Sequence, residues 1–390
     1  MSISACPACS GSLRFFHAQD GVPAHSCLLL ASRQDAVSYP KGDIALGVCE
    51  ACGFITNMEF NPALSDYSTS YEETQGFSPR FRAFAHDLAA RWIDRYDIRD
   101  KDVLEIGCGK GEFLALMCEL GGNRGVGIDP SYVPGRHNAE TDRARFISEL
   151  YNERHAGLAA DVVVCRHTLE HIQPVGGFLH MVRRAIGDRR DVVVLFEVPD
   201  TLRVLQEGAF WDVYYEHCSY FTAGSLARLF RASGFDILDL SLEFDGQYLV
   251  VEAVPADGPV TAEGAGEDDL AEIEAGVQRF RNAYSATVRL WREELLVRRA
   301  NKERSVIWGA GSKGVSFVVT MGPNSGVDYA VDINPLKQGM YLAGVGTEVV
   351  APEFLKARPP DLVVVMNPIY IGEITEMLDA LDVHPDVRAV

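Results

Sequence analysis

Residues 103–111 constrain the fold more than any other segment of this chain. The apolar run Val103-Leu104-Glu105-Ile106 leads directly into glycines at three alternate positions, 107, 109 and 111. Glycine accepts backbone conformations that other residues avoid, so the chain can turn sharply after the run and a ligand can approach the main chain. The segment therefore predicts a buried strand, a ligand-binding loop and a helix with free N–H groups at its start.

Three further apolar runs follow at intervals that leave room for a helix between neighbours. They cover residues 125–129, 161–165 and 191–196. Ahead of them, large apolar residues recur every three or four positions between 79 and 96, which is typical of one face of a helix. Apolar strands that alternate with helices indicate an α/β domain with a mostly parallel, doubly wound sheet covered on both faces.

The 390 residues are enough for two or three domains. Residues 6–60 are predicted to be rich in loops and turns, with short β segments. A stretch rich in Gly, Ala, Asp and Glu interrupts the later pattern between 255 and 267, and a long helix over 269–302 is predicted after it. Further predicted strands lie at 304–308, 328–331 and 361–365. The predicted domains are 1–65, 66–255 and 256–390.

Two pairs of cysteines, Cys6 with Cys9 and Cys49 with Cys52, lie near the start of the chain. Two residues between cysteines let both thiolates bind one ion, and two such knuckles make a tetrahedral four-sulfur zinc site. A redox-active dithiol is the alternative, but two separate pairs favour the metal. Four thiolates leave no open coordination position, so the predicted zinc is structural. The residues between the knuckles that are predicted to take no part are His17, His25 and Cys27.

Two cofactors compete for the glycine loop. A dinucleotide fingerprint, G-x-G-x-x-G, would need its third glycine one residue later, and Glu105 suits an ammonium group better than a pyrophosphate. The second strand ends in Asp129-Pro130. A carboxylate at this position could accept hydrogen bonds from both hydroxyls of a ribose, or it could cap a helix.

The loop and its surroundings resemble the first motif of class I methyltransferases, which bind S-adenosylmethionine. The resemblance implies that the loop holds the methionine part of this cofactor and that Asp129 binds its ribose. His167, after the third strand, would lie between cofactor and substrate, and Thr168 could cap the next helix. The predicted cofactor residues are Tyr71, Glu105, Gly107, Cys108, Gly109, Gly111, Asp129, Pro130 and His167.

Over nearly the whole chain, the order of motifs resembles the bacterial sugar C-methyltransferases. The order is zinc knuckles, a tyrosine-rich segment around Tyr71, the glycine loop, the segment 214–221 (YYEHCSYF) and a glycine-rich loop near the end. These enzymes methylate nucleotide-linked keto-deoxysugars at carbon. The resemblance implies that a base lies in the Glu216-His217 pair and that a tyrosine hydroxyl contacts the substrate. The implied catalytic residues are His217, Glu216, Tyr214 and His171.

Carbon methylation needs a base that removes a proton beside a carbonyl group, and donors that hold the resulting oxyanion. Histidine titrates near neutrality and suits the base role. Neighbours in an extended chain point in opposite directions, so Glu216 and His217 are not both expected to face the substrate. Two alternatives stay open: O- or N-methylation of another small polar metabolite, and a non-catalytic zinc-containing binding scaffold.

The terminal loop Gly309-Ala310-Gly311-Ser312-Lys313-Gly314 follows a predicted strand and precedes a helical pattern, and Asp332 ends the next strand. This context matches the dinucleotide fingerprint. Three roles are open for this Rossmann-like lobe: it binds the nucleotide diphosphate of the substrate, it only shapes the cleft, or it binds NAD. We favour the first role. Lys313 could then meet a phosphate, although a solvated lysine is the default expectation for this residue.

Charge and composition narrow the partners. The net charge is −19 and Lys and Arg form no runs, which disfavours nucleic acid and anionic membranes. No apolar stretch reaches about 18 residues and no leader pattern follows Met1, so neither a transmembrane helix nor a signal peptide is predicted. The nine cysteines include five that are scattered, which indicates reduced thiols. We expect a cytoplasmic protein that acts on a small molecule, in an undetermined oligomeric state.

Overall fold

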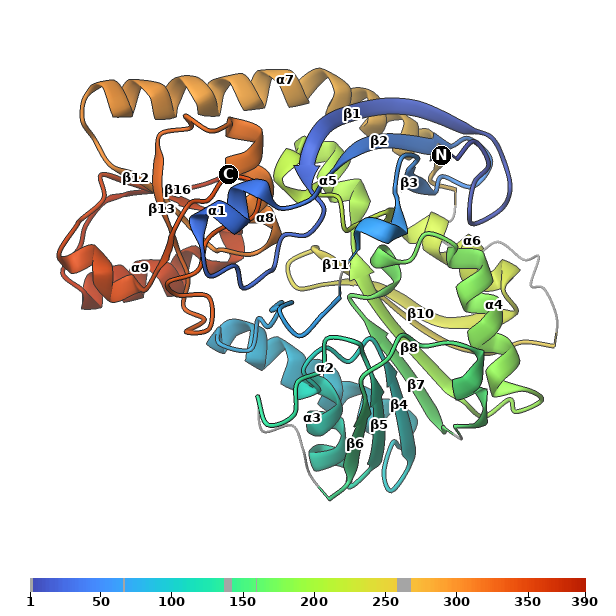
Figure 1. The fold of residues 1–390 in the computed structure, drawn as a ribbon. Coiled ribbons are helices and arrows are strands. Elements are labelled where there is room, and N and C mark those ends of the chain that lie inside the picture. Colours follow the sequence, from blue (N-terminus) through green and yellow to red (C-terminus); the bar gives the residue numbers. More distant parts are fainter. Residues whose placement is uncertain (1–2, 66, 137–141, 159, 258–267) are drawn as a thin grey trace.

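The computed structural model describes residues 3–65, 67–136, 142–158, 160–257 and 268–390 (Figure 1). Three sheets organise these residues: a four-stranded sheet near the N-terminus, a seven-stranded central sheet and a five-stranded sheet near the C-terminus. Most of the predicted Gly- and acid-rich stretch at 255–267 lies outside the described residues. No helix of the described part of the chain is long and apolar enough to cross a membrane.

The central sheet has the doubly wound order predicted for a class I methyltransferase. Its strand order is β10-β11-β8-β7-β4-β5-β6, and only β11 runs antiparallel to its neighbours. The strands are β4 (Asp102–Ile106), β5 (Arg124–Ile128), β6 (Ala144–Ile147), β7 (Val162–Arg166), β8 (Val193–Pro199), β10 (Phe235–Glu243) and β11 (Tyr248–Pro255). The four strands predicted from apolar runs are thus β4, β5, β7 and β8.

Helices cover both faces of the central sheet, as the doubly apolar strands require. One face packs against α2 (Pro79–Tyr96) and α3 (Glu112–Gly121). The other face packs against α4 (Val175–Ile186) and α6 (Ala223–Ala232). Alternation along β4 explains the two cores, because Val103 lies in the first and Leu104 in the second.

The N-terminal sheet differs from the prediction in two ways. Its strands β1 (Leu13–Pro23) and β2 (Lys41–Cys49) are long rather than short, and they pair with each other in antiparallel fashion. The helix α1 (Arg33–Ser38) lies between them, and β3 (Ile55–Asn57) continues the sheet. The fourth strand, β9 (Ser219–Tyr220), comes from the predicted catalytic segment. The zinc-knuckle region and the methyltransferase region therefore share one sheet.

The C-terminal lobe is a parallel sheet of order β14-β13-β12-β15-β16. The long helix α7 (Leu270–Ala300) leads into it and also runs along the N-terminal sheet and α5 (Thr201–Glu207). One apolar cluster joins β1 and β2 with α7 and this lobe. The elements of the lobe are β12 (Ser305–Trp308), α8 (Ser312–Met321), β13 (Val327–Val331), β14 (Val349–Val350), β15 (Leu362–Val365), α9 (Ile371–Ala380) and β16 (Asp386–Ala389).

Candidate active site

A cavity of about 1380 Å³ brings the predicted motifs together. Its walls come from the glycine loop after β4, the start of α2, the catalytic segment before β9 and the glycine-rich loop after β12. Every predicted cofactor residue except Gly111 lines this cavity, as do three of the four predicted catalytic residues. The fourth, Glu216, is absent from the cavity lining.

The glycine loop turns through backbone conformations that favour glycine. Gly107 and Gly109 have φ values of +71° and +53°. A Cβ on Gly107 would lie 1.9 Å from the hydroxyl oxygen of Thr168, so this position has no room for a side chain. Thr168 does not cap the following helical turn, contrary to one prediction: its hydroxyl donates to the carbonyl oxygens of Arg166, at 3.0 Å, and Gly107, at 3.3 Å.

Asp129 braces the loop from the next strand. Its Oδ2 accepts from the N–H of Gly109 at 2.9 Å, and its Oδ1 accepts from the N–H of Ser131 at 2.7 Å. Lys110 is buried and donates to the main-chain oxygens of Tyr71, at 2.6 Å, and Ser131, at 2.8 Å. This lysine therefore ties the Tyr71 segment to the glycine loop.

Glu105 supplies a buried carboxylate beneath the loop. Only 3 % of the residue is exposed, and burial raises the pKa of its carboxyl to about 8, although the nearby Arg166 opposes that shift. Its Oε2 is buried and has no hydrogen-bond partner among the described residues. An acceptor in this state can take a cationic donor from a ligand.

His167 is held in a left-handed backbone conformation, with φ of +48°. Its N–H donates to the carbonyl oxygen of Glu197 at 2.9 Å, and its Nε2 lies 2.6 Å from Oε1 of the same residue. Arg166 donates two hydrogen bonds to the Glu197 carboxylate, at 3.0 and 3.1 Å. Burial alone would lower the pKa of His167, but Glu197 and Glu170 raise it to about 9.

The predicted catalytic histidines lie edge to face. The ring centroids of His171 and His217 are 4.8 Å apart, and the ring of Tyr214 lies 4.2 Å from that of His217. Nδ1 of His171 lies 2.9 Å from the hydroxyl of Tyr67. Burial and the neighbouring His171 lower the pKa of His217 to about 3. His217 is therefore a neutral imidazole, with Tyr214 and His171 beside it in the cavity.

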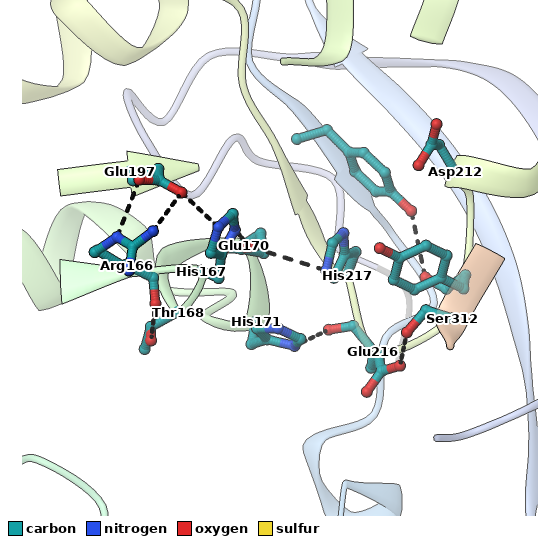
Figure 2. A network of polar contacts seen from close by, with 12 residues as sticks. Arg166, His167, Thr168, Glu170, His171, Glu197, Asp212, Glu216, His217 and Ser312 are labelled. Atoms are coloured by element: carbon teal, nitrogen blue, oxygen red, sulfur yellow. Dashed lines mark hydrogen bonds and ion pairs between the residues drawn. The ribbon is translucent and has the colours of Figure 1, made fainter. Parts of the chain in front are cut away.

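The carboxylate of Glu216 is directed toward Ser312 at the start of α8 (Figure 2). Its Oε2 lies 3.0 Å from Nδ1 of His25, and its Oε1 accepts from the Ser312 hydroxyl at 3.0 Å. Sequence reasoning missed His25 and Ser312 because each is far from Glu216 in the chain. Cys27, also dismissed, lines the cavity and its Sγ lies 3.4 Å from the Ser312 hydroxyl.

The aromatic residues around the segment divide between core and cavity. The side chains that line the cavity are Tyr214 and Tyr220. The others pack in the hydrophobic clusters that join the domains: Phe210, Trp211, Tyr215 and Phe221.

The four knuckle cysteines meet at one point. Sγ of Cys6 lies 3.7 Å from that of Cys52, and Sγ of Cys9 lies 3.5 Å from that of Cys49. All four sulfurs lie within 4.8 Å of one another. Four sulfurs held roughly 2.3 Å from a tetrahedral zinc would be about 3.8 Å apart, so this donor set fits the ion. Gly53, with φ of +72°, makes the turn after the second knuckle.

The terminal loop meets the same cavity from the opposite side. Asp332 braces it, because its Oδ2 accepts from the N–H of Ala310 at 2.8 Å. Lys313 is not a solvated surface lysine: its Nζ lies 2.9 Å from Oδ1 of Asp212 and 3.4 Å from Oε1 of Gln247. The first turn of α8 has no side-chain cap, and its residues Ser312, Lys313 and Gly314 line the cavity.

The sequence matches two protein families. Residues 80–240 match a methyltransferase domain, and residues 265–383 match the C-methyltransferase C-terminal domain. The C-methyltransferase NovU of Streptomyces niveus is 29 % identical over 303 residues, which are 73 % of this chain and 70 % of that protein. Ribosomal protein L11 methyltransferase of Haemophilus influenzae is 38 % identical over 84 residues, only 20 % of this chain and 28 % of that protein.

Two solved structures of methyltransferases are each similar to less than half of this chain. The 1,6-didemethyltoxoflavin-N1-methyltransferase of Burkholderia thailandensis is 22 % identical, with a TM-score of 0.36 over 46 % of this chain and 82 % of that chain. The magnesium protoporphyrin IX methyltransferase of Synechocystis PCC 6803 is 16 % identical, with a TM-score of 0.36 over 47 % of this chain and 90 % of that chain.

The match to a methyltransferase domain covers the central lobe, and the match to a C-methyltransferase C-terminal domain covers α7 and most of the terminal lobe. The chain is therefore an S-adenosylmethionine-dependent methyltransferase, and it is similar to bacterial C-methyltransferases.

Proposed function

We propose that this C-methyltransferase methylates a carbon atom of a nucleotide-linked keto-deoxysugar after a histidine has removed a proton beside the keto group. The observation that carries the proposal is a single cavity with three chemically distinct parts. The glycine loop and Glu105 form one part, the neutral His217 lies in the next, and the loop with Lys313 forms the last.

The glycine-loop end takes the cofactor, which supplies an electrophilic methyl group when bound. Glu105 accepts from the methionine ammonium, and the start of α3 faces the carboxylate. Asp129 accepts from the ribose hydroxyls with the lone pairs that its two backbone contacts leave free. The remaining residues on this side shape the pocket: Tyr71, Gly107, Cys108, Gly109, Gly111, Pro130 and His167.

His217 removes the proton from the carbon beside the keto group. It is uncharged and lines the cavity, so its lone pair is available to accept a proton. The hydroxyl of Tyr214 and the ring of His171 lie beside it and can donate to the enolate oxygen. The carbon then takes the methyl group, and the proton stays on His217 until the product leaves.

The terminal loop takes the nucleotide diphosphate. The uncapped start of α8 and the ammonium of Lys313 present positive charge to the cavity. We assign no redox role to this lobe, because the cofactor end already provides the reactive group. A small molecule that spans both ends accounts for a cavity of about 1380 Å³.

We also propose that the four cysteines hold a structural zinc ion. The second knuckle is the turn between β2 and β3, and β3 pairs with β9 directly after His217. Zinc therefore stabilises β3, the strand with which the catalytic segment pairs through β9. Cys49→Ser should abolish the zinc content of the purified protein, whereas Cys118→Ser, on the buried face of α3, should retain it. Plasma mass spectrometry measures both, and a Cys49→Ser protein with full zinc content would refute the site.

The test of function begins with a mass-spectrometric screen of nucleoside diphosphate keto-deoxysugars for the mass gain of one methyl group. With an accepted sugar in D2O and no cofactor, wild-type protein should exchange the hydrogen beside the keto group, which NMR detects. His217→Asn should abolish the exchange, and His180→Asn, outside the cavity, should not. Methyl transfer to oxygen or nitrogen, unaffected by His217→Asn, would show that no enolate forms.

A further inference from the structure

The base His217 needs a carboxylate partner once it has accepted a proton, and Glu216 is already engaged. Both oxygens of Glu216 have partners, His25 and Ser312, each at 3.0 Å. The side chains of Glu216 and His25 are fully buried. Glu216 thus joins the segment after β1 to the start of α8, and its carboxylate cannot turn to His217 without breaking both contacts.

Glu170 is the carboxylate that lies beside His217 in space. It belongs to a short 3-10 turn at Leu169–His171, and only 2 % of the residue is exposed. Its Oε1 lies 4.0 Å from Nε2 of His217 and 3.6 Å from Nδ1 of His167 (Figure 2). Its Oε2 is buried and has no hydrogen-bond partner in the described part of the chain. A buried acceptor in this condition is uncommon in folded proteins.

The turn that contains Glu170 also contacts the main chain of residues 216 and 218, on either side of His217. The N–H of Cys218, the residue after His217, donates to the carbonyl oxygen of Glu170 at 3.0 Å. Nδ1 of His171 lies 3.1 Å from the carbonyl oxygen of Glu216. One backbone hydrogen bond and one contact between the His171 ring and a backbone oxygen therefore hold the turn at Leu169–His171 against the residues on either side of His217.

Burial and His171 lower the pKa of His217, and the charges of Glu170, Glu216 and Asp212 oppose that shift. Burial should raise the pKa of Glu170, but contact with His167 and the nearby His171 and His217 lower it, so the carboxyl is ionised. His217 is neutral at rest. The titratable and charged groups that face His217 are Glu170, His171, Asp212, Tyr214, Glu216 and Tyr220; those that face His167 are Arg166, Glu170, Glu197 and Tyr248.

We infer that Glu170 is a positioning residue for the reaction: its carboxylate orients the ring of His217 and stabilises the positive charge that the ring gains when it removes the proton from the substrate. The inference rests on the proposed base role of His217. Attraction between the two groups arises only after the proton has moved, so it stabilises the enolate state more than the ground state.

The test compares Glu170→Gln with Glu216→Gln, which remove one charge each without changing side-chain volume. Glu170→Gln should lower both kcat and the rate of hydrogen–deuterium exchange in the accepted keto-sugar by about 100-fold, a typical contribution of a supported general base. Its dissociation constant for S-adenosylmethionine, measured by calorimetry, should stay within about threefold of wild type. Glu216→Gln should instead raise KM for the sugar, with exchange in the saturated enzyme retained.

A second readout needs no substrate. In protein labelled with carbon-13 at the histidine rings, Glu170→Gln should lower the pKa of His167 from about 9, because one of its two carboxylate neighbours has lost its charge. An unchanged titration of His167 would mean that the carboxyl of Glu170 carries no charge beside it. If Glu170→Gln unfolds at a lower temperature, Glu170→Asp provides the same comparison: it keeps the charge and should recover part of the exchange rate.

The outcomes separate this inference from the proposed function. Loss of exchange in His217→Asn together with near-wild-type exchange in Glu170→Gln would overturn the role of Glu170 and leave the base in place. Retained exchange in His217→Asn would overturn the base itself. Loss of exchange in both variants, together with a lowered pKa of His167 in Glu170→Gln, supports Glu170 as the positioning residue for the base His217.

Discussion

The two glycine-rich loops of this chain have the same backbone brace but different chemical surroundings. In the central lobe, Asp129 accepts from the N–H groups of Gly109 and Ser131, at 2.9 and 2.7 Å. In the terminal lobe, Asp332 accepts from those of Ala310 and Asn334, both at 2.8 Å. Each loop leads into a ten-residue helix without a side-chain cap, α3 or α8.

The difference lies in what surrounds each loop. Two residues before the first glycine, the central lobe has Glu105 with a free carboxylate oxygen, and the terminal lobe has the apolar Ile307. A Cβ built on Gly107 would lie 1.9 Å from the hydroxyl oxygen of Thr168, whereas nothing lies within 4 Å of a Cβ built on Gly311. The comparison teaches that the glycine spacing specifies a turn, while the adjoining side chains specify the ligand.

The largest expected effect comes from the crowded glycine. Gly107→Ala places a methyl group 1.9 Å from the Thr168 hydroxyl at a φ of +71°, so the loop must move. We expect cofactor affinity to fall by 100-fold or more, on the order of 3 kcal/mol. The matched variant Gly311→Ala has open space and negative φ and should leave that affinity unchanged in calorimetry. Equal losses in both variants would mean that the loops are not specialised.

Removing the charge under the central loop should have the next largest effect. Glu105→Gln should weaken cofactor binding by about 10-fold, since a hydrogen bond to a charged group contributes roughly 1.5–3 kcal/mol. The pKa of Glu105 is raised to about 8, so the wild-type carboxyl is mostly protonated at pH 6 and increasingly ionised toward pH 8. The dissociation constant of Glu105→Gln for the cofactor, divided by that of the wild type, should therefore increase from pH 6 to pH 8. A constant ratio would mean that Glu105 does not bind the methionine ammonium.

A smaller effect is expected at the terminal loop. Lys313→Met removes one ammonium group. Because this ammonium already pairs with Asp212 at 2.9 Å, only part of its charge is available to attract a phosphate in the wild-type protein. KM for the nucleotide-linked sugar should rise by about fivefold, or roughly 1 kcal/mol, with the cofactor affinity unchanged. Steady-state kinetics with each ligand varied in turn makes the measurement. A change in cofactor affinity instead would place the lysine in the other half of the cavity.

The smallest effect should come from the braces themselves. Asp332→Asn weakens two hydrogen bonds to backbone N–H groups, which costs roughly 1–2 kcal/mol of stability in the terminal lobe. Urea unfolding followed by hydrogen exchange in β12 and α8 should detect this loss, with cofactor affinity retained. Asp129→Asn should show a similar local loss and also weaker cofactor binding. Unchanged cofactor affinity in Asp129→Asn would separate the brace from the ribose.

Much of the fold followed from local patterns. The helix predicted over 79–96 is α2, and the strand expected at 102–106 is β4, with the same bounds. The length of β1 and β2 was not predicted, because their partly exposed residues lack a continuous apolar run. The participation of β9 in the N-terminal sheet was also missed, since a two-residue strand has no periodicity to recognise.

The sequence predicted which residues lie in the candidate site, but it did not predict which of them contact one another. The cofactor and histidine residues came from motifs. The resemblance implied that the base lies in the Glu216-His217 pair, and alternation along an extended chain predicted that the two side chains do not both face the substrate. The sequence did not predict what Glu216 contacts instead. Its actual partners are His25, 191 residues away, and Ser312, 96 residues away. For Glu170, the available signal was an acidic residue directly before the predicted catalytic His171.

The sequence by itself determined the local elements: a strand, a glycine turn and a helix in each lobe, and the two cysteine knuckles. These depend on backbone preferences and on apolar periods of a few residues, which neighbours along the chain supply. The tertiary structure decided which carboxylate faces His217, which faces His25, and that all the motifs share one cavity. Such pairings form because buried polar groups need hydrogen-bond partners, which here come from distant parts of the chain. The number of residues between two groups does not predict whether they will be partners.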